Sequence, residues 1–217
     1  MLKGIIFDLD GVICHTDEFH YMAWKELADR ENIYFDREIN KRLGGVERMA
    51  SLEIILERAS RTYTQEEKEI MANAKNDTYR RLLMGMTPAD VAPEARSVLT
   101  QLRHKGYQLA IGSSSKNARL TLGRIGLLNA FDAITDGNDI IRSKPDPEVF
   151  LKAAKMLGLK PEECLVVEDA QAGIQAAHDG GFHNAAMADA GKIELAEYRW
   201  ENFRELLWIC EQLRQEK

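Results

Sequence analysis

Two short apolar segments of the sequence end in pairs of acidic residues, Asp8 and Asp10 in the first and Glu168 and Asp169 in the second. Apolar runs of this length that stop at a turn signal predict buried parallel strands. The carboxyl edge of such a sheet is where ligands bind. Gly11 frees the backbone to turn there, so the Asp8 carboxylate and the Asp10 carbonyl can face one cation. Four crowded carboxylates repel one another without a cation, and hard oxygen donors suit Mg²⁺.

Two other polar residues follow predicted structural boundaries. Ser113 stands between an apolar strand and the start of a helix, where free amides and the helix dipole favour an anion such as a phosphoryl group. Simple capping of the helix is the alternative role for Ser113. Lys144 precedes a proline, which holds it extended. It is then placed to neutralise charge on a phosphoryl group and on Asp8, although any single lysine can also be a solvated surface residue.

These segments together resemble the haloacid dehalogenase superfamily of phosphoryl-transfer enzymes. The matching segments are residues 8–12 (Asp-Leu-Asp-Gly-Val), Ser113, residues 144–147 (Lys-Pro-Asp-Pro) and residues 168–169 (Glu-Asp). The resemblance implies that Asp8 is a nucleophile that becomes an aspartyl phosphate, and that Ser113 grips the transferring phosphoryl group. It also implies that Asp169 completes a site for one Mg²⁺ ion, which Glu168 supports directly or through water. Asp10 is then the general acid and base for the substrate oxygen.

Strands and helices alternate in most of the chain, but a block of pure helix interrupts them. The alternation implies βαβ units and a parallel sheet, and the helical block reads as an inserted domain. We therefore expect an α/β fold with a Rossmann-type parallel sheet core, formed by residues 1–14 and 88–217, and an all-helical cap domain, residues 15–87. Cap helices are expected at residues 16–30, 37–43, 47–60 and 65–84. Core helices are expected at residues 94–105, 116–126, 147–157, 171–179 and 201–213, and later strands at 107–112, 131–135, 164–167 and, more weakly, 183–188.

The helical block carries a second, more specific resemblance. Thr16, His20 and Trp24 stand four residues apart on one predicted helix face. A lone histidine is more often structural than catalytic, but this one adjoins the loop of the nucleophile. With residues 43–52, 75–79, 87–91 and 115–117, they resemble the β-phosphoglucomutase family over about residues 1–180.

The family resemblance assigns roles to these residues. Arg48 would clamp the second, non-transferring phosphate of the substrate, which an arginine fork suits. Thr16 and His20 would help to position Asp10 as the cap closes and excludes water. The residues that would hold that phosphate or the sugar from the core are Ser115, Lys116 and Asn117. Those that would read the sugar from the cap are His20, Trp24, Gly45, Val46, Ser51, Lys75 and Asn76.

The implied reaction interconverts β-D-glucose 1-phosphate and glucose 6-phosphate through β-glucose 1,6-bisphosphate, with glucose 1,6-bisphosphate or a similar donor as activator. The sequence departs from the family pattern at His15, usually an acid, and at Gly44, usually a lysine. A sugar-phosphate phosphatase and a mutase for another sugar phosphate therefore stay open as alternatives. A catalytically silent sugar-phosphate sensor would predict loss of the core acids, which are all present.

The overall composition narrows the partners. The chain has 217 residues and a net charge of -6 without a basic patch, which argues against nucleic acid. No apolar run approaches the roughly 18 residues of a membrane span, and the N-terminus already predicts a strand rather than a signal peptide. Three cysteines, an odd number, indicate a reduced, cytoplasmic setting. We expect a monomer whose partner is a small sugar phosphate.

Overall fold

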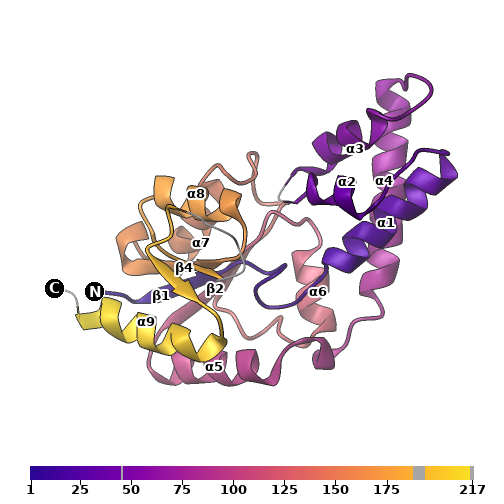
Figure 1. Cartoon of the computed structure of the whole chain (residues 1–217). Coiled ribbons are helices and arrows are strands. Elements are labelled where there is room, and N and C mark those ends of the chain that lie inside the picture. Colours follow the sequence, from indigo (N-terminus) through magenta and orange to yellow (C-terminus); the bar gives the residue numbers. More distant parts are fainter. Residues whose placement is uncertain (45, 188–193, 216–217) are drawn as a thin grey trace. The chain divides into compact units, whose positions relative to one another are not determined.

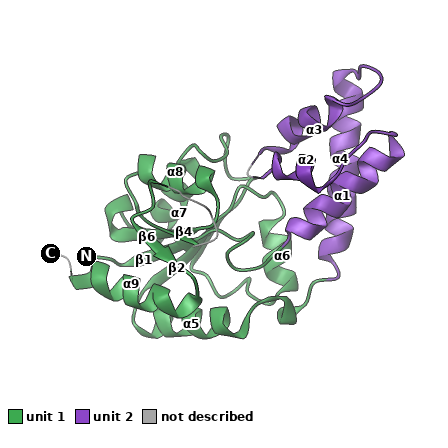
Figure 2. Ribbon diagram, viewed as in Figure 1, with its two compact units in different colours: residues 1–15, 86–217 green, residues 16–85 purple. Residues whose placement is uncertain are grey.

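The computed structural model describes residues 1–44, 46–187 and 194–215 (Figure 1). The chain divides into two compact units (Figure 2). Unit 1 comprises Met1–His15 and Met86–Lys217, and unit 2 comprises Thr16–Gly85.

Unit 1 contains the predicted parallel sheet. Its six strands lie in the order β3-β2-β1-β4-β5-β6, and every neighbouring pair is parallel. The strands are β1 (Gly4–Phe7), β2 (Gln108–Gly112), β3 (Ala133–Thr135), β4 (Cys164–Glu168), β5 (His183–Met187) and β6 (Tyr198–Trp200). The central strands β1 and β4 are buried throughout, as their unbroken apolar runs require.

Strand register sets which residues meet at the carboxyl edge of the sheet. Phe7 of β1 is paired with Ile111 of β2 on one side and with Val167 of β4 on the other. The residues that follow these positions, Asp8 and Glu168 among them, therefore leave the sheet side by side. The sequence prediction that two acid-terminated strands share an edge is confirmed.

Helices flank this sheet: α5 (Pro93–His104), α6 (Ala118–Arg124), α7 (Glu148–Leu157), α8 (Gln171–Asp179) and α9 (Phe203–Gln215). Helix α7 packs on β1, β2 and β3, and Val149 and Phe150 of α7 join Ile6 and Val166 of the strands in one apolar core. Gly112 permits this close packing, because a Cβ there would lie 2.6 Å from the ring of Phe150.

Unit 2 consists of helices α1 (Asp17–Arg30), α2 (Arg37–Lys41), α3 (Arg48–Leu56) and α4 (Gln65–Leu83). Helix α4 packs against α1 and α3. The apolar core of unit 2 includes Trp24, Leu27, Leu52 and Ile55. Among the residues of unit 2 that are described, no strand occurs, as predicted.

The sequence also predicts two caps in unit 2: Thr16 or Asp17 at the start of its first helix, and a Thr-x-x-Glu capping pattern that begins at Thr64. Thr64 forms a capping box with Glu67, in which each side chain accepts a hydrogen bond from the main-chain amide of the other, at 3.2 and 2.7 Å. This prediction is confirmed. Thr16 occupies the N-cap position before Asp17, the first residue of α1, as the prediction of Thr16 or Asp17 allowed, but its side chain makes no capping hydrogen bond.

Several elements differ from their predicted limits. Helix α2 ends at Lys41 rather than at residue 43, and α3 covers Arg48–Leu56 rather than residues 47–60. Glu47 is the cap of α3, accepting from Met49 N at 2.7 Å and Ala50 N at 3.3 Å. Helix α6 begins at Ala118, so the residues at 116 and 117 belong to the loop before it.

The C-terminal part of the sheet was only partly predicted. The weak strand at residues 183–188 is confirmed as β5 over His183–Met187, and Ala188 lies outside the described residues. Strand β6 was not expected, because a three-residue strand with an exposed arginine at its centre gives no clear pattern.

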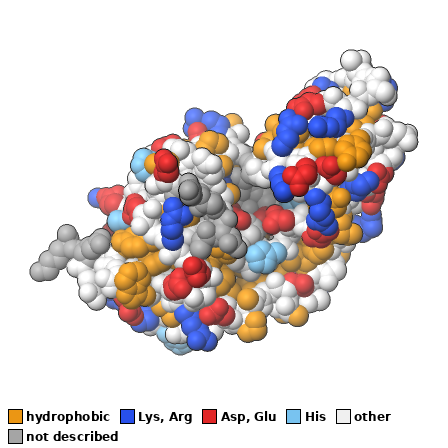
Figure 3. All heavy atoms as spheres, in the orientation of Figure 1, with side chains coloured by type: hydrophobic (Ala, Val, Ile, Leu, Met, Phe, Trp, Pro, Cys, Tyr) orange, Lys and Arg blue, Asp and Glu red, His pale blue; other side chains and the backbone are white. Residues whose placement is uncertain are grey.

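Acidic and basic side chains are interspersed over both units on the face shown in Figure 3. Helices in the described part of the chain all fall short of the length and apolarity that a membrane crossing needs.

Candidate active site at the carboxyl edge of the sheet

Lys144 joins two of the predicted acids in a buried ion-pair cluster. Its Nζ lies 2.5 Å from Asp8 Oδ1 and 2.6 Å from Glu168 Oε1. The side chains of Lys144, Asp8 and Glu168 are 8%, 10% and 1% exposed, respectively. Lys144 also lies 4.6 Å from the ring centroid of Phe150. Buried charges need such close partners, since each loses its hydration.

Glu168 is held by the turn that joins β4 to α8. Its Oε2 accepts hydrogen bonds from Asp169 N at 2.8 Å and from Ala170 N at 2.7 Å, while Oε1 contacts Lys144. Gly173 leaves the room for this side chain, because a Cβ there would lie 1.8 Å from Glu168 Oε1. Both oxygens of Glu168 thus already have partners within the protein.

Asp169 lies against the turn that follows β1. Gly11 has a φ of +92°, and a Cβ on it would lie 2.0 Å from Asp169 Oδ2. The same turn is closed by a hydrogen bond from Gly11 N to Cys14 O at 2.8 Å. The Asp169 carboxylate therefore sits beside the segment that carries Asp8 and Asp10.

Burial and neighbouring charges shift the pKa values of Asp8 and Lys144 in this cluster. Burial raises the pKa of Asp8 well above its ordinary value, Lys144 opposes this shift, and the carboxylates of Glu168, Asp10 and Asp169 add to it. Burial lowers the pKa of Lys144, but Asp8 and Glu168 outweigh burial and raise it. Lys144 therefore remains an ammonium ion beside the Asp8 and Glu168 carboxylates.

The donors at this edge fit a divalent cation. In the described part of the chain, no group of three or more His, Cys, Asp or Glu side chains is arranged to hold a metal. A set made of the Asp8 and Asp169 carboxylates and the Asp10 carbonyl needs only two such side chains, and all three donors are the hard oxygens that Mg²⁺ prefers. Glu168, with both oxygens engaged, suits the supporting role better than direct binding.

The loop after β2 follows the strand next to β1. In this loop Ser113 Oγ accepts from Ser115 N at 3.1 Å, and Ser115 Oγ accepts from Asn117 N at 3.2 Å. A hydroxyl that accepts through a lone pair keeps its proton for donation. Ser113 and Asn117 are buried, and Lys116 is exposed. Because α6 begins only at Ala118, Ser113 shapes this loop and does not cap the helix.

Within unit 2, Lys75 and three residues around it form a group in which Lys75, Trp24 and Tyr79 are buried and His20 is half-buried. Lys75 Nζ lies 3.0 Å from His20 Nδ1 and 4.6 and 4.9 Å from the ring centroids of Trp24 and Tyr79. Burial, followed by the charges of Lys75 and Arg48, lowers the pKa of His20 well below its ordinary value. His20 is therefore neutral at pH 7, and its Nδ1 accepts from the Lys75 ammonium.

Other predicted residues of unit 2 form hydrogen bonds within the unit. Arg48 Nη2 donates to Asn76 Oδ1 at 2.9 Å, and Ser51 Oγ donates to Val46 O at 3.2 Å. Thr16 is fully buried. Gly45 lies outside the described residues.

Sequence reasoning missed residues that support these loops. Glu148 Oε2 accepts from Ile141 N at 3.1 Å and from Arg142 N at 2.9 Å, which fixes the segment before Lys144. The sequence pattern also gave no sign that Gly173 makes room for the Glu168 side chain. Residues 136–139 (Asp-Gly-Asn-Asp), which follow β3, were also missed. Their strong turn signal, at the carboxyl end of a strand in the same sheet, could have identified them.

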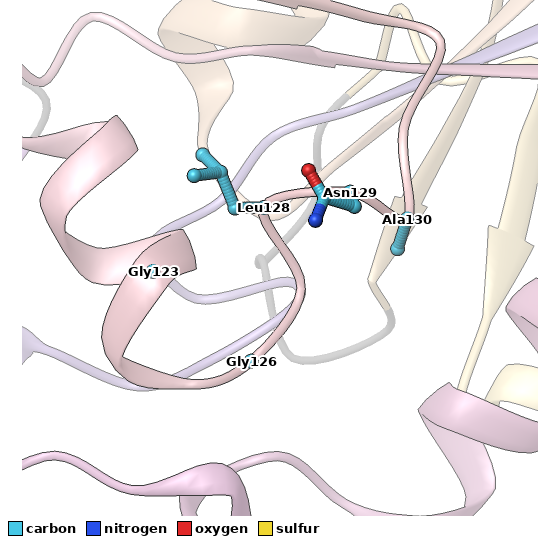
Figure 4. Close-up of a pocket in the computed structure, with 5 residues that line it drawn as sticks. All are labelled: Gly123, Gly126, Leu128, Asn129 and Ala130. Atoms are coloured by element: carbon cyan, nitrogen blue, oxygen red, sulfur yellow. The ribbon is translucent and has the colours of Figure 1, made fainter.

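A pocket in unit 1 lies away from this chemistry (Figure 4). It is lined by Gly123, Gly126, Leu128, Asn129 and Ala130. These residues end α6 and lead into β3, so they lie towards the amino edge of the sheet. None of the five side chains titrates, and we assign the pocket no role in catalysis.

The comparisons with known proteins agree with this geometry. The family description "haloacid dehalogenase-like hydrolase" matches residues 2–181, and the chain belongs to this family of enzymes. At the level of single proteins, the chain is 37% identical to the β-phosphoglucomutase of Bacillus subtilis (strain 168), over 94% of this chain and 97% of that protein.

Two more relatives are a mutase and a phosphatase. The crystal structure of a β-phosphoglucomutase from Clostridium difficile matches with a TM-score of 0.91 and 35% identity, over 99% of this chain and 98% of that one. The fructose-1-phosphate phosphatase YqaB of Escherichia coli (strain K12) is 29% identical, over 82% of this chain and 93% of that protein. The predicted fold class is confirmed, and the chain falls among the phosphosugar mutases and phosphatases of its family.

Proposed function

We propose that this chain is a Mg²⁺-dependent mutase that interconverts β-D-glucose 1-phosphate and glucose 6-phosphate. The observation that carries the proposal is similarity to two β-phosphoglucomutases at 37% and 35% identity over 94% and 99% of the chain, so that unit 2 is included. The phosphatase relative is 29% identical over 82% of the chain. The core cluster around Asp8 is needed for either reaction, so the choice rests on this breadth of similarity.

The chemistry follows from the residues around Asp8. In its phosphorylated form, Asp8 gives its phosphoryl group to the 6-hydroxyl of β-glucose 1-phosphate, and Asp10 takes the hydroxyl proton. The bisphosphate then reorients so that its 1-phosphoryl group faces Asp8. The unphosphorylated Asp8 carboxylate attacks the 1-phosphoryl group, the bond between phosphorus and the sugar oxygen breaks, and Asp10 returns a proton to that oxygen. Glucose 6-phosphate leaves and Asp8 is phosphorylated again.

The charge that gathers on the transferring group needs compensation. Lys144, protonated and bound to Asp8, supplies part of it, and Ser113 would donate its hydroxyl proton to a phosphoryl oxygen. The Asp8 and Asp169 carboxylates and the Asp10 carbonyl would hold Mg²⁺, with Glu168 in support. The metal, when bound, neutralises negative charge on these acids and on the phosphoryl oxygens.

Substrate recognition is assigned to two sets of residues. We assign the second phosphate and the sugar to a set in unit 1, which is Ser115, Lys116 and Asn117. In unit 2, the proposed cap domain of residues 15–87, Arg48 would clamp the second phosphate, and Thr16 and His20 would help to position Asp10. The residues of unit 2 that would read the sugar are His20, Trp24, Gly45, Val46, Ser51, Lys75 and Asn76. Glucose 1,6-bisphosphate or a similar donor would first phosphorylate Asp8.

The setting is also a proposal. Cys14, Cys164 and Cys210 are all buried, and no disulfide joins any two of them, which supports work in a reducing cytoplasm. We propose that the enzyme acts as a monomer, which size-exclusion chromatography with light scattering tests.

A sugar-phosphate phosphatase is the second candidate, because a fructose-1-phosphate phosphatase is among the relatives. A mutase for another sugar phosphate would use the same residues of unit 1. The two reactions differ in whether water reaches the aspartyl phosphate.

The deciding experiment follows glucose 6-phosphate and free phosphate in one tube. The purified chain is given Mg²⁺, β-glucose 1-phosphate and a trace of glucose 1,6-bisphosphate. Glucose 6-phosphate with little free phosphate supports the mutase, and dominant free phosphate assigns the chain to the phosphatases. Loss of both products with EDTA and their return with Mg²⁺ tests the metal. If neither product forms, the assignment to glucose phosphates is wrong.

A further inference from the structure

The loop after β3 lies directly on the loop after β2. We call residues 136–139 the β3 loop and residues 113–117 the serine loop. Gly137 N donates to Ser115 O at 3.1 Å. A Cβ on Gly137 would lie 2.3 Å from Ser114 O and 2.9 Å from Lys116 N. The two backbones therefore touch at a distance that a side chain would prevent.

Asn138 extends this contact with its side chain. Its Nδ2 donates to Lys116 O at 3.0 Å and to Asp136 Oδ1 at 3.0 Å. Lys116 O and Asn117 N belong to one peptide group, and Asn117 N donates to Ser115 Oγ at 3.2 Å. This peptide group is thus held at its carbonyl by Asn138 and at its amide by Ser115, which fixes its plane.

The β3 loop is itself anchored. Asp136 N donates to Asp139 Oδ2 at 2.9 Å, and Asn138 N donates to Asp136 Oδ1 at 2.8 Å. Asp136 is only 1% exposed, and its Oδ2 lies 3.2 Å from Nε of Arg119. Arg119 belongs to α6, which follows the serine loop directly, and its Nη2 donates to Ile134 O at 2.7 Å. Asn138 therefore acts from a fixed base.

We propose that Asn138 is a positioning residue for the serine loop. It holds the peptide group between Lys116 and Asn117 so that Ser115, Lys116 and Asn117 of this loop present their donors to the second phosphate or the sugar of the substrate. This inference rests on the proposed function for the identity of the ligand. It predicts that Asn138 affects affinity for sugar phosphates and leaves the phosphoryl chemistry at Asp8 unchanged.

The test compares two kinds of phosphodonor in the full-length protein. β-Glucose 1-phosphate and glucose 1,6-bisphosphate carry a sugar, and the bisphosphate carries a second phosphate. Acetyl phosphate offers a phosphoryl group to Asp8 but has neither feature. Asn138→Ala should raise KM for both sugar phosphates about fivefold, the effect of one net hydrogen bond, with kcat/KM for acetyl phosphate unchanged.

Two further variants sharpen the comparison. Asn138→Asp keeps the shape but cannot donate, and it places a carboxylate against Lys116 O and Asp136, so KM should rise more than in Asn138→Ala. Asn129→Ala removes an exposed asparagine between α6 and β3. This variant should leave KM for the sugar phosphates and kcat/KM for acetyl phosphate unchanged. The proposal would be overturned if Asn138→Ala lowered kcat/KM equally for acetyl phosphate and the sugar phosphates, or if it left KM for the sugar phosphates unchanged.

Amide hydrogen exchange separates this inference from the proposed function. In Asn138→Ala the Asn117 amide should exchange faster than in the wild type, whichever substrate the enzyme uses. If the wild type turns over acetyl phosphate but neither glucose phosphate, the proposed function fails. Exchange at Asn117 then decides the role of Asn138 alone, and an unchanged rate would refute it.

Discussion

Gly173 offers a direct test of how the acid cluster is held. It lies in the first turn of α8, where a Cβ would stand 1.8 Å from Glu168 Oε1 and 2.0 Å from Glu168 Cδ. Glu168 cannot yield easily, since it is bound to Lys144 Nζ at 2.6 Å and to two main-chain amides. The substitution Gly173→Ala must therefore displace this carboxylate and break its contacts.

The magnitude comes from opposing effects. Alanine favours the helix over glycine by about 1 kcal/mol. Breaking a buried ion pair costs about 3–5 kcal/mol, because it leaves buried charge without a partner. We expect the free energy of unfolding of Gly173→Ala to fall by about 2–4 kcal/mol. Turnover should fall at least about tenfold, since Lys144 loses one of the two carboxylates that orient it.

Gly123→Ala is the matched control. Gly123 is also helical, but a Cβ there would meet no heavy atom within 4 Å. This variant should gain about 0.5–1 kcal/mol from helix propensity alone and keep full activity. Urea unfolding followed by circular dichroism, with turnover measured on the same samples, compares the two. A Gly173→Ala protein that matched Gly123→Ala in stability and activity would refute the account of Glu168.

Three other substitutions test separate parts of the molecule. Asp8→Asn should abolish turnover of every phosphate ester while leaving the circular dichroism spectrum unchanged, and surviving activity would show that Asp8 is not the nucleophile. Burial keeps the pKa of His20 well below 6.5 in the folded protein, so the unfolded chain binds the extra proton below that pH. The stability that the neutral ring contributes is present above pH 6.5 and lost as the pH falls. His20→Gln should therefore lose less stability than the wild type when the pH is lowered from 7.5, and parallel curves of Tm against pH would contradict this. Thr64→Ala removes the capping box of α4 and should lower the free energy of unfolding by about 1 kcal/mol, whereas Thr62→Ala, in the preceding loop, should change it little.

The strands that carry the site were predictable because burial on both faces leaves a mark in the sequence. β1 and β4 are unbroken apolar runs, and each stops at acids. A parallel sheet aligns such stops at one edge, so the meeting of Asp8 with Glu168 followed from the pattern. The register that pairs Phe7 with Val167 is the structural expression of that rule.

Other features depended on distant partners and could not be predicted locally. The residues at 116 and 117 suit a helix by propensity, yet α6 begins after them, because the β3 loop binds Ser115 O and Lys116 O. Tertiary contacts override propensity in such cases. Strand β6 is defined by pairing with β5, and its own three residues carry almost no pattern.

The same limit applies to charges in unit 2. The sequence placed Lys75 among the residues that read the sugar but could not indicate that it contacts His20, 55 positions away along the chain. Nor could it indicate that the ammonium lies over two aromatic rings. Long-range side-chain pairs of this kind become visible only in the folded unit.

The acid cluster depends as much on two missing side chains as on the acids themselves. At Gly11 a Cβ would lie 2.0 Å from Asp169 Oδ2, and at Gly173 one would lie 1.8 Å from Glu168 Oε1. The carboxylates of Asp169 and Glu168 therefore pack directly against the backbone at these two glycines, although the acids repel one another. Burial and this repulsion raise the pKa of Asp8, and the charge of Lys144 opposes them. Because a bound divalent cation would relieve the repulsion without moving the backbone, glycine at these two positions supports the proposed metal site together with the acids.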